Sequence, residues 1–198
     1  MAGICGIILA GGRATRMGGG DKGLLPLAGR PMVAHVIARL APQVAPLAIS
    51  ANGDPARWAP FGLPVLADSV PGHPGPLAGV LAGMDWAAGM GAAQVLTAAA
   101  DTPFLPHDLA ARLAGAGDFA LAASPDTGGT LRLHPTCGLW PVRLRHDLRA
   151  ALLAGSRRVT GWALDHGAAT VPFAADGGDP FFNINTPQDL ARARAMAG

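Results

Sequence analysis

Hydrophobic residues along this chain occur in two patterns that alternate, short continuous runs and longer stripes at helical spacing. Continuous apolar runs bounded by Gly, Pro or Asp are typical of buried strands, whereas apolar residues three and four positions apart are typical of amphipathic helices. The runs predict strands at residues 4–9, 47–50, 64–66, 94–99, 119–123, 133–140 and 169–173. The stripes predict helices at residues 31–40, 76–88, 106–114, 143–153, 157–166 and 187–197.

The alternation of strands and helices predicts the fold class. Parallel strands need a helical crossover between them, so a strand–helix order along the chain indicates a parallel sheet covered on both faces. We therefore expect an α/β fold with a three-layer, doubly wound, mostly parallel sheet of the Rossmann-like type. No internal repeat or linker divides residues 1–198, so a single domain is expected, with the Gly- and Pro-rich residues 70–76 as a loop. Ligands of such sheets bind beyond the carboxyl ends of the strands.

Composition limits the partners of the chain. Half of the residues are apolar, 14% are charged and the formal net charge is +2, so the broad basic face that nucleic acid or an anionic membrane requires is not expected. No stretch reaches the ~18 apolar residues that span a bilayer, and the first residues lack the basic region of a secretion signal. Cys5 and Cys137 lie in apolar stretches without CxxC spacing, which predicts buried free thiols. We expect a cytoplasmic protein whose polyanionic ligands are small.

Residues 9–23, directly after the first predicted strand, are rich in glycine and contain three cations, Arg13, Arg16 and Lys22. Small residues let backbone N–H groups face phosphate oxygens, and several cations would balance the nearly four negative charges of a triphosphate. An ordinary turn does not need a loop of this length. The segment therefore predicts a phosphate site.

Two common phosphate motifs do not fit this loop. Gly18, Gly20 and Gly23 match GxGxxG formally, but they begin well after the strand ends, and no Asp or Glu follows between Lys22 and Asp54 to bind a ribose. The Walker pattern fails because Lys22 precedes a glycine instead of Ser or Thr. A dinucleotide cofactor and a P-loop ATPase are both disfavoured.

Asp101 follows the predicted strand 94–99, where a carboxylate could hold Mg²⁺ together with phosphates. Its alternative role is a helix cap or an Asx turn. Asn183 and Asn185 flank Ile184, so in an extended segment both amides would lie on one side and Ile184 in the core. The alternative for Asn185 is to cap the helix that begins at Pro187. The six histidines have no ligand spacing and are expected to be structural.

Four blocks carry a resemblance to a known family: LAGGRATRMGGGDKGL at 9–24, GPLAG at 75–79, ADTPFLP at 100–106 and FNINTPQDL at 182–190. In this order they closely resemble the molybdenum cofactor guanylyltransferases, the MobA family, whose opening signature is L-A-G-G-x-x-x-R-M-G-G-x-D-K-G. HPTCGLW at 134–140 and GSRRV at 155–159 also resemble that family, so the likeness covers essentially the whole chain. It implies the nucleotidyltransferase form of the Rossmann-like fold.

The resemblance also implies a reaction. The phosphate of molybdopterin, or of Mo-molybdopterin, attacks the α-phosphorus of GTP with Mg²⁺ as cofactor, which yields the guanine dinucleotide and pyrophosphate. An attacking phosphate is already ionised at neutral pH, so positioning and charge neutralisation should suffice without a general base. The family further implies molybdenum insertion proteins and molybdoenzyme chaperones as protein partners.

Resemblance assigns a first group of residues to GTP: Leu9, Ala10, Gly11, Gly12, Arg16, Lys22, Asn52, Asp68 and Asp101. It assigns a second group to the acceptor: Asn183, Asn185 and Arg157. Within these groups Lys22, Asp101 and Arg16 are the expected catalytic residues, and Asp101 is the expected Mg²⁺ ligand. Asn52 and Asp68, taken alone, could equally be turn formers.

Three alternatives stay open. The same fold could serve a molybdopterin cytidylyltransferase or a sugar-phosphate nucleotidyltransferase, and a non-catalytic nucleotide-binding regulator is an alternative of another class. Gly11-Gly12 and GPLAG at 75–79 resemble the guanine-using branch, because the cytidylyl branch tends to carry Ala-Ala-Gly and a missing side chain leaves room for a purine. Lys22 together with Asp101 argues against a mere binder.

Overall fold

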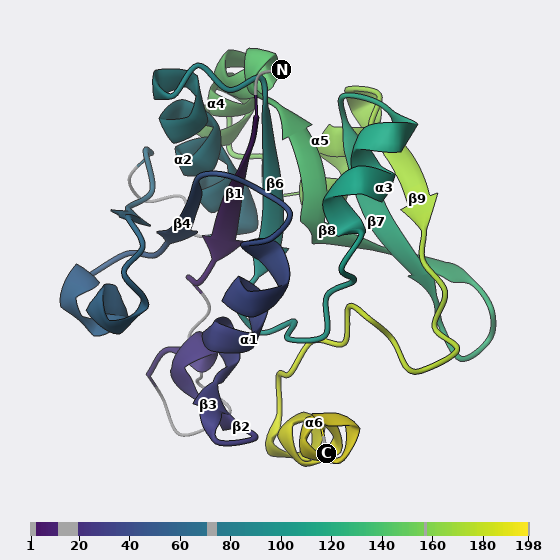
Figure 1. Ribbon diagram of the computed structural model, residues 1–198. Coiled ribbons are helices and arrows are strands. Elements are labelled where there is room, and N and C mark those ends of the chain that lie inside the picture. The colour runs from purple at the N-terminus through teal and green to yellow at the C-terminus, as the bar shows by residue number, and fades with distance from the viewer. Residues whose placement is uncertain (1–2, 12–19, 71–74, 157, 198) are drawn as a thin grey trace.

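The computed structural model describes residues 3–11, 20–70, 75–156 and 158–197. They form a seven-stranded sheet in the order β5-β4-β1-β6-β8-β7-β9 (Figure 1). The strands are β1 (Ile4–Leu9), β4 (Leu47–Ser50), β5 (Val65–Leu66), β6 (Gln94–Ala99), β7 (Ala120–Pro125), β8 (Leu131–Pro141) and β9 (Ala169–Pro172). Six of these strands run parallel and β8 is antiparallel to both of its neighbours. The predicted mostly parallel α/β sheet is confirmed.

The direction of β8 follows from the short turn before it. Asp126 Oδ1 accepts hydrogen bonds from the backbone N–H groups of Gly128 and Thr130 at 2.8 and 2.9 Å, and Gly129 adopts a positive φ of 80°. This turn is too short for a helical crossover, so β7 and β8 pair as a hairpin. The apolar pattern predicted the strand but not its direction.

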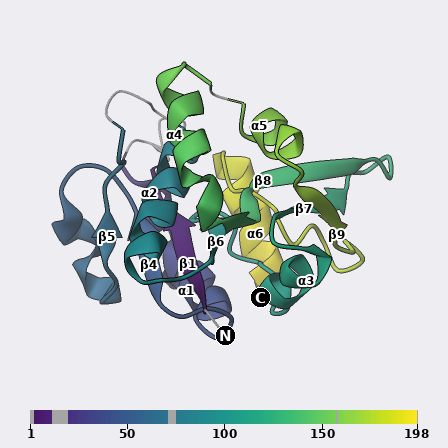
Figure 2. The ribbon, with the colours of Figure 1, turned by 90° about the horizontal axis from the view of Figure 1, so that it is seen from above.

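Helices cover both faces of the sheet (Figure 2). α1 (Met32–Leu40) and α3 (Leu109–Ala116) pack on one face, and α2 (Pro76–Gly89), α4 (Arg145–Leu153) and α5 (Val159–Asp165) pack on the other. Each face has its own buried cluster, centred on Val36, Leu109 and Ile8 on the first face and on Leu81, Leu148 and Ile7 on the second. Consecutive residues of β1 thus point into opposite cores, as a two-sided buried strand requires.

Three predicted helices begin two or three residues later than expected, among them α5, which starts at Val159 instead of residue 157. α4 starts at Arg145 after a 3-10 turn, Val142–Leu144, and α3 starts at Leu109 instead of Pro106. Gln43 explains the start of α3, because its Oε1 accepts from Ala110 N at 2.9 Å while its Nε2 donates to Pro106 O at 2.9 Å. A side chain from the loop between α1 and β4 therefore caps α3, which no local pattern shows.

Glycines bring α2 close to the sheet. A Cβ on Gly79 would lie 2.8 Å from Ser50 Oγ and 2.9 Å from Leu9 Cδ2, and one on Gly83 would lie 2.5 Å from Ile7 Cγ1. A Cβ at these distances would force the neighbouring side chains to shift, so glycine is strongly favoured at both positions. The close packing sets the N-terminal end of α2 beside the carboxyl ends of β1 and β4.

The C-terminal helix α6 (Pro187–Ala197) stands apart from the three layers, at the bottom of Figure 1. It packs on a small hairpin, β2 (Pro26–Leu27) with β3 (Arg30–Pro31), through a third buried cluster that includes Leu27, Met32, Ile184 and Ala193. Thr186 and Asp189 form a capping box, with Asp189 N donating to Thr186 Oγ1 at 3.1 Å and Thr186 N donating to Asp189 Oδ2 at 2.8 Å. The segment before α6 is thereby fixed beside the sheet.

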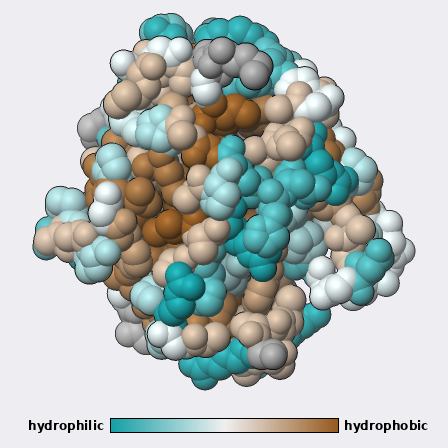
Figure 3. Space-filling view, in the orientation of Figure 1, coloured by the Kyte–Doolittle hydropathy of each residue, from teal (hydrophilic) through white to brown (hydrophobic). Residues whose placement is uncertain are grey.

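The face of the molecule in Figure 3 has an apolar part and a more hydrophilic part. Apolar residues gather on its left part, over β4 and the connection from α1 to β4, and hydrophilic residues become more frequent toward α3. Both cysteines are buried free thiols, as predicted. Within the described residues, no helix has the length and apolar character to span a membrane.

Candidate functional site

A cleft of about 1110 Å³ lies at the carboxyl ends of β1, β4 and β6 and is bordered by the segment that precedes α6. Eight residues expected from the sequence line it: Leu9, Gly11, Lys22, Asn52, Asp68, Asp101, Asn183 and Asn185. Ala10 is 3% exposed and belongs to the core behind the cleft. Gly12, Arg16 and Arg157 lie outside the described residues. The structure thus gathers at one place residues that are as far as 176 positions apart.

Lys22 is at the centre of the polar groups in this cleft. Its Nζ lies 2.6 Å from Asp101 Oδ2 and donates a second hydrogen bond to Asn185 Oδ1. The side chains of Lys22 and Asp101 are each 13% exposed, so this ion pair is largely shielded from water. Both charges are within reach of a ligand that enters the cleft.

Backbone contacts hold three segments around Asp101. Ala100 N donates to Leu9 O at 3.0 Å, which continues the pairing of β6 with β1, and Ile184 N donates to Asp101 O at 3.1 Å. A Cβ on Gly23 would lie 2.9 Å from the Cβ of Ala100, so only glycine lets the 3-10 turn Lys22–Leu24 approach this closely. The close approach of these backbone segments therefore fixes where the Lys22 side chain enters the cleft.

Two oxygens in the cleft have no partner among the described residues. Asp101 Oδ1 and Asn183 Oδ1 are buried and accept no hydrogen bond there. Buried polar atoms are nearly always satisfied in native proteins, so such a pair of acceptors indicates a site for a cation or a donor group. Carboxylate and amide oxygens are ligands that Mg²⁺ accepts, usually one or two per ion alongside phosphates and water. The residues fit a magnesium–phosphate site.

The alternative roles of Asp101 and Asn185 are not what the described contacts show. Neither carboxylate oxygen of Asp101 accepts a backbone N–H within the described part of the chain, so Asp101 makes no Asx turn there. α6 is capped by Thr186, while the side chain of Asn185 contacts Lys22. Ile184 is fully buried and the asparagines on either side of it line the cleft, as the period of two predicted.

Asn52 and Asp68 form a reciprocal pair at another part of the cleft. Asn52 Nδ2 donates to Asp68 Oδ2 at 2.7 Å, and Asp68 N donates to Asn52 Oδ1 at 2.9 Å. The two residues follow β4 and β5, whose parallel pairing brings their carboxyl ends together. Both side chains are exposed to the cleft, so they offer amide donors and carboxylate acceptors to a ligand.

Sequence reasoning missed Arg57 and Asp21. Arg57 Nε lies 2.6 Å from Asp21 Oδ2, and both residues line the cleft. Asp21 falls inside the signature at 9–24, where it received no role, and Arg57 belongs to no motif. With these two included, the described lining carries two cations and three carboxylates: Lys22, Arg57, Asp21, Asp68 and Asp101. A polyanion entering this part of the cleft would therefore need additional positive charge.

His134 shows that a Ser–His–Asp trio does occur in the fold, but in a structural arrangement. Ser124 Oγ lies 2.7 Å from His134 Nε2 and donates to Asp179 Oδ1 at 2.9 Å, so the hydroxyl bridges the other two groups. A hydroxyl with one proton that donates to a carboxylate accepts from the imidazole N–H. Burial lowers the pKa of His134 to about 4, and Ser124 is 1% exposed. This serine is neither activated nor accessible. No three His, Cys, Asp or Glu side chains cluster as a metal site among the described residues.

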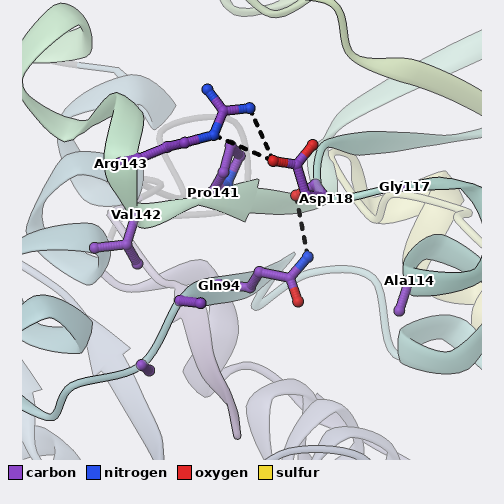
Figure 4. Close-up of a pocket in the computed structure, with 9 residues that line it drawn as sticks. Gln94, Ala114, Gly117, Asp118, Pro141, Val142 and Arg143 are labelled. Carbon is purple, nitrogen blue, oxygen red and sulfur yellow. Dashed lines mark hydrogen bonds and ion pairs between the residues drawn. The ribbon is translucent and has the colours of Figure 1, made fainter. Parts of the chain in front are cut away.

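A second, smaller cavity of about 480 Å³ lies at the opposite end of β6 (Figure 4). Asp118 accepts from Arg143 Nη2 at 2.8 Å through its carboxylate and from Gln94 Nε2 at 3.1 Å through its backbone carbonyl. Both charged side chains are about 60% exposed and neutralise each other. The remaining lining consists mainly of small and apolar residues, so this cavity offers little chemistry.

Comparison with known proteins shows which family this chain resembles over most of its length. Residues 6–168 match the MobA-like NTP transferase domain. A molybdenum cofactor guanylyltransferase of Bradyrhizobium sp. (strain ORS 278) is 54% identical over 202 aligned residues, which cover 98% of this chain and 93% of that protein. One from Cereibacter sphaeroides is 56% identical over 194 residues, with 98% and 96% covered.

Solved structures agree on the fold. Molybdopterin-guanine dinucleotide biosynthesis protein A from Archaeoglobus fulgidus superposes with a TM-score of 0.71 at 21% identity and 98% coverage of both chains. The 4-diphosphocytidyl-2C-methyl-D-erythritol synthase of Anaerococcus prevotii gives a TM-score of 0.70 at 14% identity, with 98% of this chain and 95% of that chain covered. Because proteins named for different nucleotides share this architecture, the fold alone does not decide the base.

Proposed function

The chain belongs to the MobA-like NTP transferase family, and from this premise we propose that its cleft transfers GMP from GTP to the phosphate of molybdopterin. The products are molybdopterin guanine dinucleotide and pyrophosphate. Guanylyltransferase activity is the one named for relatives that align over nearly the whole chain at more than half identity. The observation that carries the proposal is the arrangement of Lys22, Asp101 and Asn185 at the strand ends, beside two buried oxygens without partners.

Each described residue has a role that its position supports. The Lys22 ammonium reaches the middle of the cleft, where it would hold phosphate oxygens of GTP. Asp101 Oδ1 and Asn183 Oδ1 would hold the proposed Mg²⁺, whose contribution when bound is to neutralise phosphate charge and polarise the phosphorus that is attacked. Asn185, which lines the cleft as Asn183 does, would orient the acceptor.

The proposed reaction needs no general base. A phosphate nucleophile carries its negative charge at neutral pH, so the chain has only to align it with the α-phosphorus and to stabilise the leaving pyrophosphate. Lys22 is positioned for the second task by its turn and by Gly23. Arg16 and Arg157, which lie outside the described residues, are proposed to bind phosphate groups as well. Preorganised charges of this kind are the largest single contribution in many transferases.

A guanine base suits the side of the cleft near β1. A Cβ on Gly11 would meet no atom of the described residues within 4 Å, so on their side the space beside Leu9 would admit a bulky purine. Asn52 and Asp68 present donors and acceptors at the cleft surface, as recognition of a base and its ribose requires. Ala10 contributes through its backbone, since its side chain is buried in the core.

The remaining parts of the proposal concern the setting of the reaction. We place it in the cytoplasm, where proteins that insert molybdenum and chaperones of molybdoenzymes would supply the acceptor and collect the product. The near-neutral formal charge of +2 fits small anionic ligands better than a nucleic acid partner.

A four-nucleotide assay tests the proposal. The protein is incubated with molybdopterin, Mg²⁺ and one of GTP, ATP, CTP or UTP, and the dinucleotide product is identified by mass. We expect a guanine product with GTP and pyrophosphate in equal amount. A cytosine product would overturn the base assignment, and no product with any nucleotide would favour the non-catalytic binder.

A further inference from the structure

Arg57 connects two parts of the cleft that are distant in sequence. It belongs to the 3-10 helix Pro55–Phe61 that follows β4. Its Nε lies 2.6 Å from Oδ2 of Asp21, the residue before Lys22, in an ion pair that lacks hydrogen-bond alignment, and its Nη2 donates a hydrogen bond to Asn52 O. One guanidinium therefore contacts both the segment of Asp21 and Lys22 and the segment of Asn52 in the cleft.

The local backbone is built to place Arg57 there. Asp54 Oδ1 accepts from Ala56 N at 2.9 Å and caps the 3-10 helix, whose first residue is Pro55. Gly53 adopts a φ of +85°, and a Cβ at this position would lie 3.0 Å from Arg57 Nη1. Gly53 is therefore needed twice, for its backbone conformation and for the space that the guanidinium occupies.

The charges of Arg57 and Asp21 explain how this contact would matter for a bound triphosphate. Asp21 is a carboxylate directly beside the lysine that would hold phosphates, and its side chain is 22% exposed. Without a partner, its charge would repel a triphosphate across a partly shielded cleft. The Arg57 guanidinium cancels that charge and also fixes the carbonyl of Asn52, whose side chain pairs with Asp68.

We propose that Arg57 is a positioning residue of the nucleotide site, which neutralises Asp21 and joins the segment of Asp21 and Lys22 to the segment of Asn52. This inference rests on the proposed function for the identity of the nucleotide. It acts through Asp21 and Asn52, so it predicts an effect on nucleotide binding without an effect on the transfer step itself.

The test compares four variants with the wild type: Arg57→Gln, Asp21→Asn, the double variant Arg57→Gln/Asp21→Asn, and Arg149→Gln as matched control. Arg149 forms an ion pair with Asp85 at the same 2.6 Å distance and similar exposure, but between α4 and α2, and lines no part of the cleft. For each, the dissociation constant of Mg²⁺–GTP is measured by calorimetry, KM and kcat by dinucleotide formation, and folding by thermal unfolding.

We expect Arg57→Gln to raise the dissociation constant and KM for GTP by about tenfold while kcat stays within about threefold. Asp21→Asn alone should leave both within about threefold, and the double variant should recover most of the lost affinity. Arg149→Gln should match the wild type in binding. Unchanged GTP binding in folded Arg57→Gln, or no recovery in the double variant, would overturn the inference.

Two further outcomes are informative. If Arg57→Gln does not fold, Asp21→Asn still decides, because a tenfold loss of affinity there would contradict charge neutralisation as the role of the pair. If the wild type forms no dinucleotide, the proposed function fails, while calorimetry still tests the role of Arg57 in nucleotide binding. Calorimetry with CTP would separate an error in the base from an error in the role of Arg57. Whichever nucleotide binds, we expect the same order of dissociation constants among the variants.

Discussion

Replacing Asp101 by Asn should separate catalysis from folding. The substitution keeps the shape of the side chain and an oxygen that can accept from Lys22, but removes the charge that lies 2.6 Å from the ammonium. Because an acceptor remains, we expect a loss of about 1–2 kcal/mol, less than the roughly 3–5 kcal/mol of breaking a buried ion pair outright. Against a typical stability of about 5–15 kcal/mol, the variant stays almost entirely folded.

The effect on transfer should be much larger. With its oxygen accepting from Lys22, the introduced amide would turn its –NH2 group, which cannot bind a cation, to the place where the unpartnered Oδ1 of Asp101 is proposed to hold Mg²⁺. We therefore expect at least a ~10²-fold fall in transfer, or about 2.7 kcal/mol. Dinucleotide formation measured by mass and a thermal melt on the same sample check both numbers, with an expected melting shift of about 2–8 °C. A folded variant with wild-type turnover would refute the reasoning.

Other substitutions test neighbouring claims. Lys22→Ala should lower transfer at least ~10²-fold. It should also raise the affinity of the nucleotide-free protein for Mn²⁺, because the ammonium no longer pairs with the carboxylate of Asp101. Electron paramagnetic resonance measures this affinity, and weaker Mn²⁺ binding would contradict the expectation. Gly79→Ala should raise KM for GTP and cost about 1–3 kcal/mol, since its Cβ would meet Ser50 and Leu9; wild-type urea unfolding and KM would oppose it. Because burial lowers the folded-state pKa of His134 to about 4, its neutral form stabilises the fold above the ordinary pKa of 6.5, and about 3 kcal/mol is lost as pH falls from about 6.5 to 4. His134→Gln should therefore show a shallower loss of stability between pH 7 and 4.5, and an equally steep loss would exclude this origin.

Most of the long strands and helices could be predicted, because the buried strands contain apolar runs and most helices carry an apolar stripe. The hairpin of β2 with β3 and the 3-10 helix Pro55–Phe61 were not predicted, and neither were two further features. The direction of β8 depends on a short turn that the Asp126 side chain stabilises, and the start of α3 depends on Gln43 in the loop between α1 and β4. Both are set by hydrogen bonds that leave no mark on hydrophobic periodicity.

The site shows the same division. Asp101 was expected because a strand end places a carboxylate in the ligand position of this fold, and Lys22 because of the motif that contains it. Arg57 was missed, because the contact that defines it joins residues 36 positions apart and the segment around it has no motif. Charges that act by cancelling each other are visible only once the fold brings them together.

The most direct test of the central claim is a crystal structure of the protein with Mn²⁺ and a non-reactive GTP analogue, with the metal located by anomalous scattering. We predict a Mn²⁺ peak within about 2.2 Å of Asp101 Oδ1, with the triphosphate beside Lys22 and guanine near Gly11. A metal or a nucleotide bound outside this cleft would contradict the account.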